Sequence, residues 1–164
     1  MDVAKVEINS PKLFWISGVQ FAQPGNYYKI KNFINFIRQN NIDTIVNLSD
    51  YPTSQKLLKI YNQAGVGKVL TYPLDDRFFH KHEYQQLKNV LEALYQKLGN
   101  RILVNCTAGV NRSATLIVYS ILRDSYLGPD EIIEKLRESN KKWRLAPALT
   151  NPTFVDFLQN VRNI

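Results

Sequence analysis

Two patterns of hydrophobic and polar residues alternate along this chain: short apolar runs, and hydrophobic residues at helical spacing. Short apolar runs predict buried strands, which we place at residues 13–17, 44–48, 68–72 and 101–105. Between and after these runs, hydrophobic residues recur at helical spacing, as do Ile30, Phe33 and Ile37. This pattern predicts helices over residues 27–39, 53–63, 83–98, about 112–126, 129–139 and 151–162.

Asn151 and Pro152 mark the start of the last predicted helix, because Asn caps free backbone amides and Pro suits the first helical turn. Strands that alternate with helices predict an α/β fold with a mostly parallel central sheet of about four to five strands flanked by helices. The chain shows no repeats and no long linker, and we expect residues 1–164 to form one domain. Ligands of such sheets bind beyond the carboxyl ends of the strands, where residues 106–112 fall.

Residues 104–113 read Val-Asn-Cys-Thr-Ala-Gly-Val-Asn-Arg-Ser and contain the only cysteine of the sequence. Cys106 and Arg112 are separated by a short loop, with Gly109 midway and Ser113 directly after the arginine. A cysteine is more often a buried core residue than a nucleophile, so the spacing alone is weak support. The preceding apolar strand, the glycine, the serine and the following helix together favour an anion-binding site.

The chemistry expected of this loop is phosphoryl transfer. Loop amides and the helix dipole create positive potential at one point, and the planar fork of Arg112 can hold two phosphate oxygens. The same field favours the thiolate form of Cys106, which would then be a nucleophile toward a bound phosphate. The residues predicted to bind the phosphate are Thr107, Ala108, Gly109, Val110, Asn111 and Arg112.

These residues resemble the signature of the cysteine-based protein phosphatases and, more narrowly, of the small dual-specificity phosphatases, His-Cys-x-x-Gly-x-x-Arg-Ser. Residues 108–113 are especially similar to the compact poxvirus-type members. The resemblance extends over roughly residues 11–162 and includes 13–18, 41–49 and 144–158. One position departs from the pattern, because Asn105 stands where the family has histidine.

The resemblance implies a metal-independent phosphomonoesterase that needs no cofactor and acts on phosphorylated proteins. Ser113 would donate a hydrogen bond to the Cys106 sulfur and so stabilise it as a leaving group. The chain lacks a segment for the extra loop that deepens the pocket of the larger tyrosine-specific phosphatases. A shallow pocket would admit phosphoserine and phosphothreonine as well as phosphotyrosine.

The departing oxygen needs a proton, so a carboxylic acid is expected near the thiolate. Asp75 and Asp76 follow the strand predicted at 68–72. The family places its general acid at the end of a Pro-x-x-Asp turn, and Pro73 selects Asp76, with Asp75 as the alternative. Aspartates also commonly end strands without any catalytic role.

His80 and His82 do not form a metal site with the single cysteine, and we expect both to be solvated. The net charge of +7 indicates attraction to acidic partners, but the basic residues are scattered along the sequence. The charge therefore fits a phosphorylated protein, RNA or simply a basic surface.

The single cysteine excludes an internal disulfide and suits a reducing compartment. The first residues lack the pattern of a signal peptide, and the longest apolar runs are too short to cross a membrane. We expect a cytoplasmic or nuclear protein, or a component of a viral particle. The oligomeric state stays open.

Two alternatives to a protein phosphatase remain. An RNA 5′-triphosphatase is one, since relatives of that kind share a Cys-Thr-x-Gly-x-Asn-Arg loop. A phosphate-binding pseudophosphatase without turnover is the other, because Asn105 cannot carry positive charge and the thiol should ionise less readily than in relatives. Phosphoinositide phosphatases are less favoured, because residues 107–111 contain no lysine.

Overall fold

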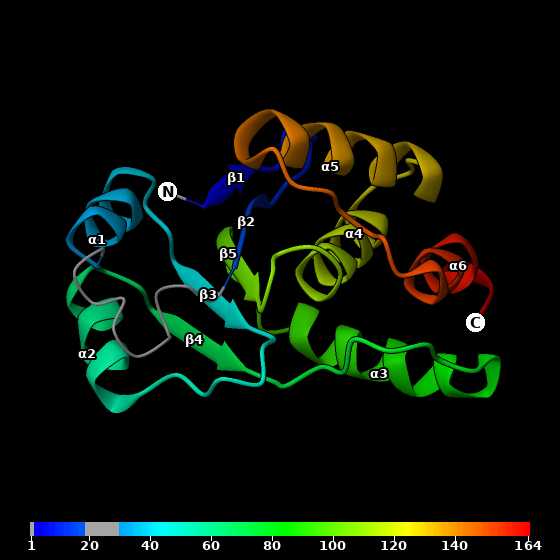
Figure 1. Cartoon of the computed structure of the whole chain (residues 1–164), viewed down its shortest axis with the longest axis horizontal. Helices are drawn as coiled ribbons and strands as arrows, with labels where there is room; N and C mark the ends of the chain where they lie inside the picture. The colour runs from blue at the N-terminus through cyan, green and yellow to red at the C-terminus, as the bar shows by residue number, and fades with distance from the viewer. Residues whose placement is uncertain (1, 19–29) are drawn as a thin grey trace.

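The computed structural model describes residues 2–18 and 30–164, which form a five-stranded sheet with helices on both faces (Figure 1). The strand order is β1-β2-β5-β3-β4. The pairs β2–β5, β5–β3 and β3–β4 are parallel, whereas β1 is antiparallel to β2. The strands span Val3–Lys5 (β1), Leu13–Gly18 (β2), Thr44–Asn47 (β3), Lys68–Thr71 (β4) and Arg101–Cys106 (β5).

The central strands are apolar on both sides, because successive side chains point to opposite faces of the sheet and each face is covered by helices. In β5, Ile102 and Val104 belong to the core beneath α3, α4, α5 and α6, whereas Leu103 belongs to the core beneath α1 and α2. The helices span Ile30–Gln39 (α1), Gln55–Gln63 (α2), Tyr84–Tyr95 (α3), Arg112–Asp124 (α4), Pro129–Arg144 (α5) and Pro152–Asn160 (α6). Short 3-10 helices at Lys81–Glu83 and Val161–Asn163 precede α3 and follow α6.

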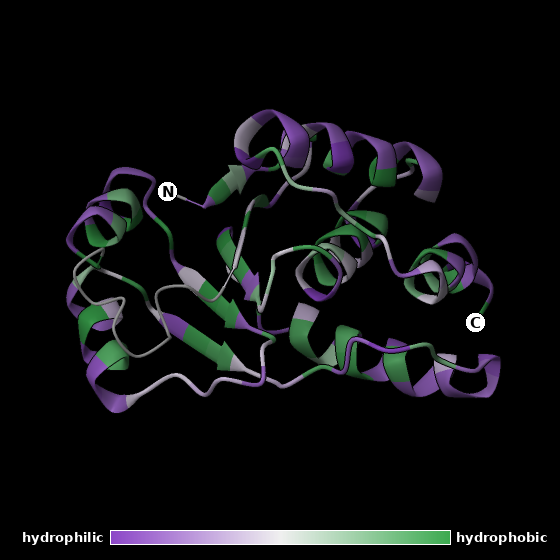
Figure 2. Ribbon diagram, in the orientation of Figure 1, coloured by the Kyte–Doolittle hydropathy of each residue, from purple (hydrophilic) through white to green (hydrophobic). Residues whose placement is uncertain are grey.

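Helix α4 occupies the centre of its layer, and every residue from 112 to 122 is buried. It contacts α3, α5 and α6 as well as strands β2 and β5. Figure 2 shows hydrophobic residues along the strands, while the outer side of α5 is hydrophilic. The loop from β5 to α4 therefore joins a strand and a helix whose adjoining residues, 102–106 and 112–122, are buried, so its ends have fixed positions.

The predicted fold class is confirmed, and β2, β3, β4 and β5 lie where the apolar runs place strands. Strand β1 has no counterpart in the sequence analysis, because three residues are too few to give an apolar pattern. The first predicted helix, 27–39, is described from Ile30 onward, and residues 27–29 lie outside the described residues. No helix within residues 2–18 and 30–164 is long and apolar enough to span a membrane.

The helix predicted over 129–139 is wrong at its end, since α5 continues to Arg144. The apolar pattern stops early because the last buried positions of α5 are the polar Ser139 and Asn140. Ser139 Oγ accepts a hydrogen bond from the Glu7 backbone N at 2.9 Å, and the Asn140 amide donates to carbonyl oxygens that follow the helix. Hydrogen bonds thus stabilise the final turns, and a hydrophobic pattern does not detect them.

A charged network joins α3 to α4 on the outer surface. The Glu92 carboxylate accepts hydrogen bonds from Arg123 Nε at 2.9 Å and Nη2 at 2.8 Å, and it also accepts one from the Tyr119 hydroxyl. The hydrogen bonds from Arg123 are the main reason that the pKa of Glu92 falls from 4.5 to about 2. Glu92 and Arg123 are 32% and 45% exposed, so water screens much of this attraction.

Replacing Glu92 by Gln should lower the free energy of unfolding at pH 7 by about 1 kcal/mol. Since the pKa of Glu92 in the folded protein is about 2, below its ordinary 4.5, the contribution is complete above about pH 4.5 and disappears as the pH falls through 2. Urea unfolding of both proteins at pH 7 and pH 3 measures the difference, with Glu134→Gln, an exposed carboxylate on α5, as the control. A difference that does not shrink toward low pH would contradict this account.

Candidate active site

Loop 106–112 joins the carboxyl end of β5 to the first turn of α4. Cys106 is only 2% exposed, and its Sγ accepts a hydrogen bond from the Gly109 backbone N at 3.2 Å. Gly109 has a φ of +65°, a left-handed conformation that residues with a Cβ rarely adopt. The loop therefore turns at least one backbone donor toward the sulfur.

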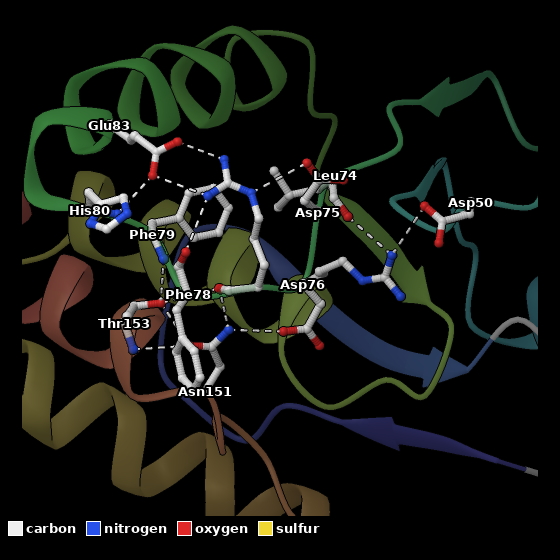
Figure 3. A network of polar contacts seen from close by, with 12 residues as sticks. Asp50, Leu74, Asp75, Asp76, Phe78, Phe79, His80, Glu83, Asn151 and Thr153 are labelled. Atoms are coloured by element: carbon white, nitrogen blue, oxygen red, sulfur yellow. Dashed lines mark hydrogen bonds and ion pairs between the residues drawn. The ribbon is translucent and has the colours of Figure 1, made fainter.

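The Arg112 guanidinium lies across this loop, and the side chain is 7% exposed. Its Nη2 donates to Thr107 Oγ1 at 2.7 Å and its Nη1 donates to the Leu74 carbonyl at 3.1 Å. The Asp50 carboxylate lies 3.7 Å from Nη1 (Figure 3). The Nε atom is buried and has no hydrogen-bond partner among the described residues, so this donor is free to hold an anion.

Ser113 follows Arg112 in the first turn of α4 and is fully buried. Its hydroxyl has no hydrogen-bond partner within residues 2–18 and 30–164, so the structure shows no contact to the Cys106 sulfur. Among the described residues, no other acceptor takes the hydrogen bond that this hydroxyl can donate. Its role toward the sulfur stays a prediction. Of the remaining loop residues, Thr107 and Ala108 are exposed and Val110 is half-buried.

Asn111 connects the loop to two distant segments. Its Nδ2 donates to Asp76 Oδ2 at 3.0 Å, and its Oδ1 accepts from the Asn151 backbone N at 3.0 Å. Asn151 in turn donates from its own Nδ2 to Asp76 Oδ1 at 3.0 Å (Figure 3). Each oxygen of the Asp76 carboxylate is therefore held by a different asparagine side chain.

Asp75 and Asp76 are both exposed, but they face different partners. Asp76 is bonded to Asn111 of loop 106–112, whereas Asp75 forms a 3.6 Å ion pair with Arg77 and its side chain is 72% exposed. The structure therefore brings Asp76, rather than Asp75, into a hydrogen-bonded network with the cysteine loop.

The segment that carries Asp76, residues 72–80, is fixed by an ion pair at its far end. Glu83 accepts from Arg77 Nη2 at 2.7 Å and Nη1 at 3.1 Å, and from the His80 backbone N at 2.8 Å. The hydrogen bond from Arg77, followed by that from His80, lowers the pKa of Glu83 from 4.5 to about 2. The carboxylate thus keeps its charge in mildly acidic solution, and segment 72–80 keeps this attachment.

Sequence reasoning treats Asn151 only as a helix cap, and this part is confirmed, since its Oδ1 accepts from the Thr153 backbone N at 3.0 Å. The sequence does not reveal the second role of Asn151. Its side-chain amide donates to Asp76 Oδ1 and also to the Arg77 carbonyl at 2.7 Å. No local pattern could have revealed this contact, because 75 residues separate Asn151 from Asp76.

Asn105, the departure from the family signature, is buried and donates from Nδ2 to Asn47 Oδ1 at 3.0 Å. Asn47 also accepts from the Ser49 backbone N at 3.0 Å and donates to the Tyr51 carbonyl at 2.7 Å. Asn105 therefore joins the end of β5 to the loop that follows β3, which contains Asp50. The side-chain nitrogen of Asn105 thus has a partner within the protein, and the effect of Asn105 on the thiol stays a prediction.

His80 and His82 are both exposed, as predicted, and their rings stack with centroids 5.5 Å apart. The part of the chain that the structure describes contains no group of three or more His, Cys, Asp or Glu side chains that could hold a metal ion. His80 is the last residue of segment 72–80 and His82 follows it, so neither histidine is part of the cysteine loop.

The chain is similar to known proteins in sequence and in fold. The family described as "Dual specificity phosphatase, catalytic domain" matches residues 24–160. Protein 123R of Invertebrate iridescent virus 6, a candidate tyrosine phosphatase by its name, is 32% identical over 96 residues. That match covers 56% of this chain and 60% of the viral protein, so it spans less than two thirds of the relative's length.

Solved structures share the fold at lower identity. The PTP-2 phosphatase of Cydia pomonella superposes with a TM-score of 0.65 at 21% identity, covering 97% of this chain and 89% of that one. Kinase associated phosphatase, crystallised with its catalytic-site cysteine replaced by serine, has a TM-score of 0.64 at 15% identity. The superposition covers 98% of this chain and 93% of that one. At these identities the likeness concerns the fold.

The position of Asp50 predicts how strongly the site binds anions. Its carboxylate is 73% exposed and lies beside Arg112 Nη1, so it repels any anion that Arg112 holds. Asp50→Asn should therefore raise the affinity for inorganic phosphate or vanadate about threefold at low salt, and the gain should shrink at high ionic strength. Isothermal titration measures both. A loss of affinity would instead show that Asp50 orients Arg112.

Proposed function

Because the chain belongs to the dual specificity phosphatase family, we propose that it hydrolyses phosphomonoesters of proteins through a phosphocysteine formed at Cys106. One observation carries the proposal: a buried cysteine sulfur receives a backbone N–H from Gly109, beside an arginine whose buried Nε has no partner among the described residues. An anion bound there would meet the nucleophile and a charged donor together.

In the first step, the Cys106 thiolate attacks phosphorus in line with the ester oxygen. The S–P bond forms while the bond from phosphorus to the substrate oxygen breaks, and the three remaining oxygens lie in the loop. Arg112 and the amides of residues 107–112 balance the charge on these oxygens. This arrangement needs no metal ion to neutralise the phosphate.

Both halves of the reaction depend on Asp76, which acts first as an acid and then as a base. As an acid, its carboxyl group gives a proton to the departing oxygen, which leaves as the free alcohol or phenol. The resulting carboxylate then takes a proton from the water that attacks the phosphocysteine. Inorganic phosphate is released, the thiolate is restored and Asp76 is protonated again, so atoms and protons balance. Ser113 would stabilise the departing sulfur by donating its hydroxyl, which has no partner among the described residues.

The proposed substrates are phosphotyrosine and phosphoserine or phosphothreonine in proteins. Family membership supports phosphoprotein substrates, and the similarity to a viral protein named for tyrosine phosphatase activity supports phosphotyrosine among them. The net charge of +7 favours any phosphorylated ligand and does not choose between them.

The substrate class is tested with p-nitrophenyl phosphate, phosphotyrosine and phosphothreonine peptides, and 5′-triphosphate RNA, each in the presence of chelator. We expect hydrolysis of the first three, inhibition by vanadate, and no turnover by Cys106→Ser, which should still bind phosphate because Arg112 and the amides remain. Release of phosphate from the RNA alone would reassign the enzyme. Binding of phosphopeptides without any turnover would identify a pseudophosphatase.

The acid is tested with leaving groups of different quality. Asp76→Asn should lower kcat about 100-fold for an alkyl phosphate, but far less for p-nitrophenyl phosphate, whose leaving group departs without a proton. Asp75→Asn is the matched control, because it removes the neighbouring carboxylate, which pairs with Arg77 instead. If Asp75→Asn shows this dependence on the leaving group and Asp76→Asn does not, Asp75 is the acid.

A further inference from the structure

Arg144, the last residue of α5, contacts the outer side of the cysteine loop from a buried position. Its side chain is only 2% exposed. Nη2 donates to the Ala108 carbonyl at 2.7 Å and Nη1 donates to the Gly109 carbonyl at 2.6 Å. One planar guanidinium therefore holds two consecutive carbonyl groups of the loop.

The same guanidinium is held in place by Asp2. Nε donates to Asp2 Oδ1 at 2.5 Å and Nη2 donates to Oδ2 at 2.8 Å, so the pair is bidentate. Nη1 also donates to Asn140 Oδ1 at 3.1 Å. Together with the two loop carbonyls, these acceptors match the full set of N–H donors that an arginine offers. The orientation of Arg144 is thereby completely specified.

These contacts determine which way the loop amides point. In a planar trans peptide, the C=O of one residue and the N–H of the next point in opposite directions. Arg144 holds the Ala108 carbonyl outward, and the following N–H, that of Gly109, points inward to the Cys106 sulfur at 3.2 Å. By the same geometry, the outward Gly109 carbonyl turns the N–H of Val110 inward.

A third carbonyl of the loop, that of Val110, is also held outward, because it accepts a hydrogen bond from the Leu149 backbone N at 2.9 Å. The fit between Arg144 and the loop is close: a Cβ added to Gly109 would lie 2.7 Å from Arg144 Nη1. A Cβ on Gly18, at the end of β2, would lie 3.0 Å from Asp2 Oδ2 and 3.2 Å from the Thr107 carbonyl. Asp2, Arg144 and the loop thus pack as one unit with no space for an added side chain.

We propose that Asp2 and Arg144 are positioning residues that keep the carbonyl groups of Ala108 and Gly109 turned outward, so that the loop amides face a bound phosphate. The inference rests on the proposed phosphatase function, since it concerns the same site. Without Asp2, Arg144 loses its bidentate partner and the loop peptides can rotate. A rotated peptide would turn a carbonyl oxygen toward the phosphate and the thiolate, which both carry negative charge.

The chain offers a matched control. Glu7 and Lys142 form a 3.2 Å ion pair between the same N-terminal segment and the same helix, with side chains 44% and 60% exposed. Among the described residues, the Glu7 and Lys142 side chains bond to each other and form no hydrogen bond or ion pair with the loop. Asp2→Asn and Glu7→Gln each remove one carboxylate and change the net charge equally. The two pairs differ in burial, so a difference in stability alone is expected; a difference in kcat and in vanadate affinity reports contact with the loop.

The experiment compares the wild type with four variants, Asp2→Asn, Asp2→Glu, Arg144→Lys and Glu7→Gln. For each protein it measures kcat and KM for p-nitrophenyl phosphate, the dissociation constant of vanadate, and the midpoint of thermal unfolding. We expect Asp2→Asn to lower kcat about tenfold and to weaken vanadate binding by a similar factor. Its midpoint should fall below that of Glu7→Gln, because the buried Arg144 guanidinium loses its carboxylate partner. Asp2→Glu keeps the carboxylate and should recover most of the loss. Arg144→Lys keeps the charge but loses the fork, and should lower kcat further.

The proposal is overturned if Asp2→Asn equals Glu7→Gln in both kcat and vanadate affinity. Should the wild type hydrolyse nothing, the proposed function fails, yet vanadate binding by the same variants still decides whether Asp2 and Arg144 set the loop. If the wild type neither turns over nor binds vanadate, both proposals fall. If the Arg144→Lys variant does not fold, the comparison of Asp2→Asn, Asp2→Glu and Glu7→Gln still tests the proposal.

Discussion

The orientation of the peptide groups between Cys106 and Arg112 is the constraint on which the rest of the site depends. A loop that binds an anion with backbone N–H groups must turn its carbonyl oxygens away from that anion, and each buried carbonyl then needs a donor elsewhere. The fold supplies those donors from outside the loop. Arg144 serves two of the carbonyls and the Leu149 backbone N serves a third.

Hydrogen bonds also couple the cysteine loop to the segment that carries Asp76, the proposed acid. The Arg112 guanidinium donates to the Leu74 carbonyl, and the Asn111 side chain donates to Asp76 two residues further on. Segment 72–80 is attached at its other end through Arg77 and Glu83. The proposed nucleophile, the arginine proposed to bind the anion and the proposed acid therefore belong to one connected network, so a displacement of segment 72–80 would move Asp76 relative to the sulfur.

The parts of this arrangement that the sequence predicts are those encoded by neighbouring residues. The strand, loop and helix around Cys106 lie within one stretch of chain, so their order and spacing could be read directly. A short turn pattern, Pro73 to Asp76, resembles that of the family and selects Asp76 over Asp75, and the hydrogen bond from Asn111 favours the same residue.

Contacts between distant residues could not be predicted in this way. Asp2 and Arg144 are 142 positions apart, and Arg144 lies beyond the end that the apolar pattern gives to α5. The final turns of that helix are stabilised by buried polar groups, Ser139 and Asn140, rather than by hydrophobic contacts. Periodicity detects apolar burial, so it misses a helix end and a guanidinium that are both held by hydrogen bonds.

Trapping the covalent intermediate is the most direct test of the central claim that Cys106 accepts the phosphoryl group. The protein is mixed with p-nitrophenyl phosphate, quenched in acid within milliseconds to seconds, digested, and analysed by mass spectrometry. The account predicts one phosphoryl group on the peptide that contains Cys106, formed during turnover and lost as hydrolysis proceeds. Turnover that continues with no phosphoryl group on that peptide, or with the label on another residue, would contradict it.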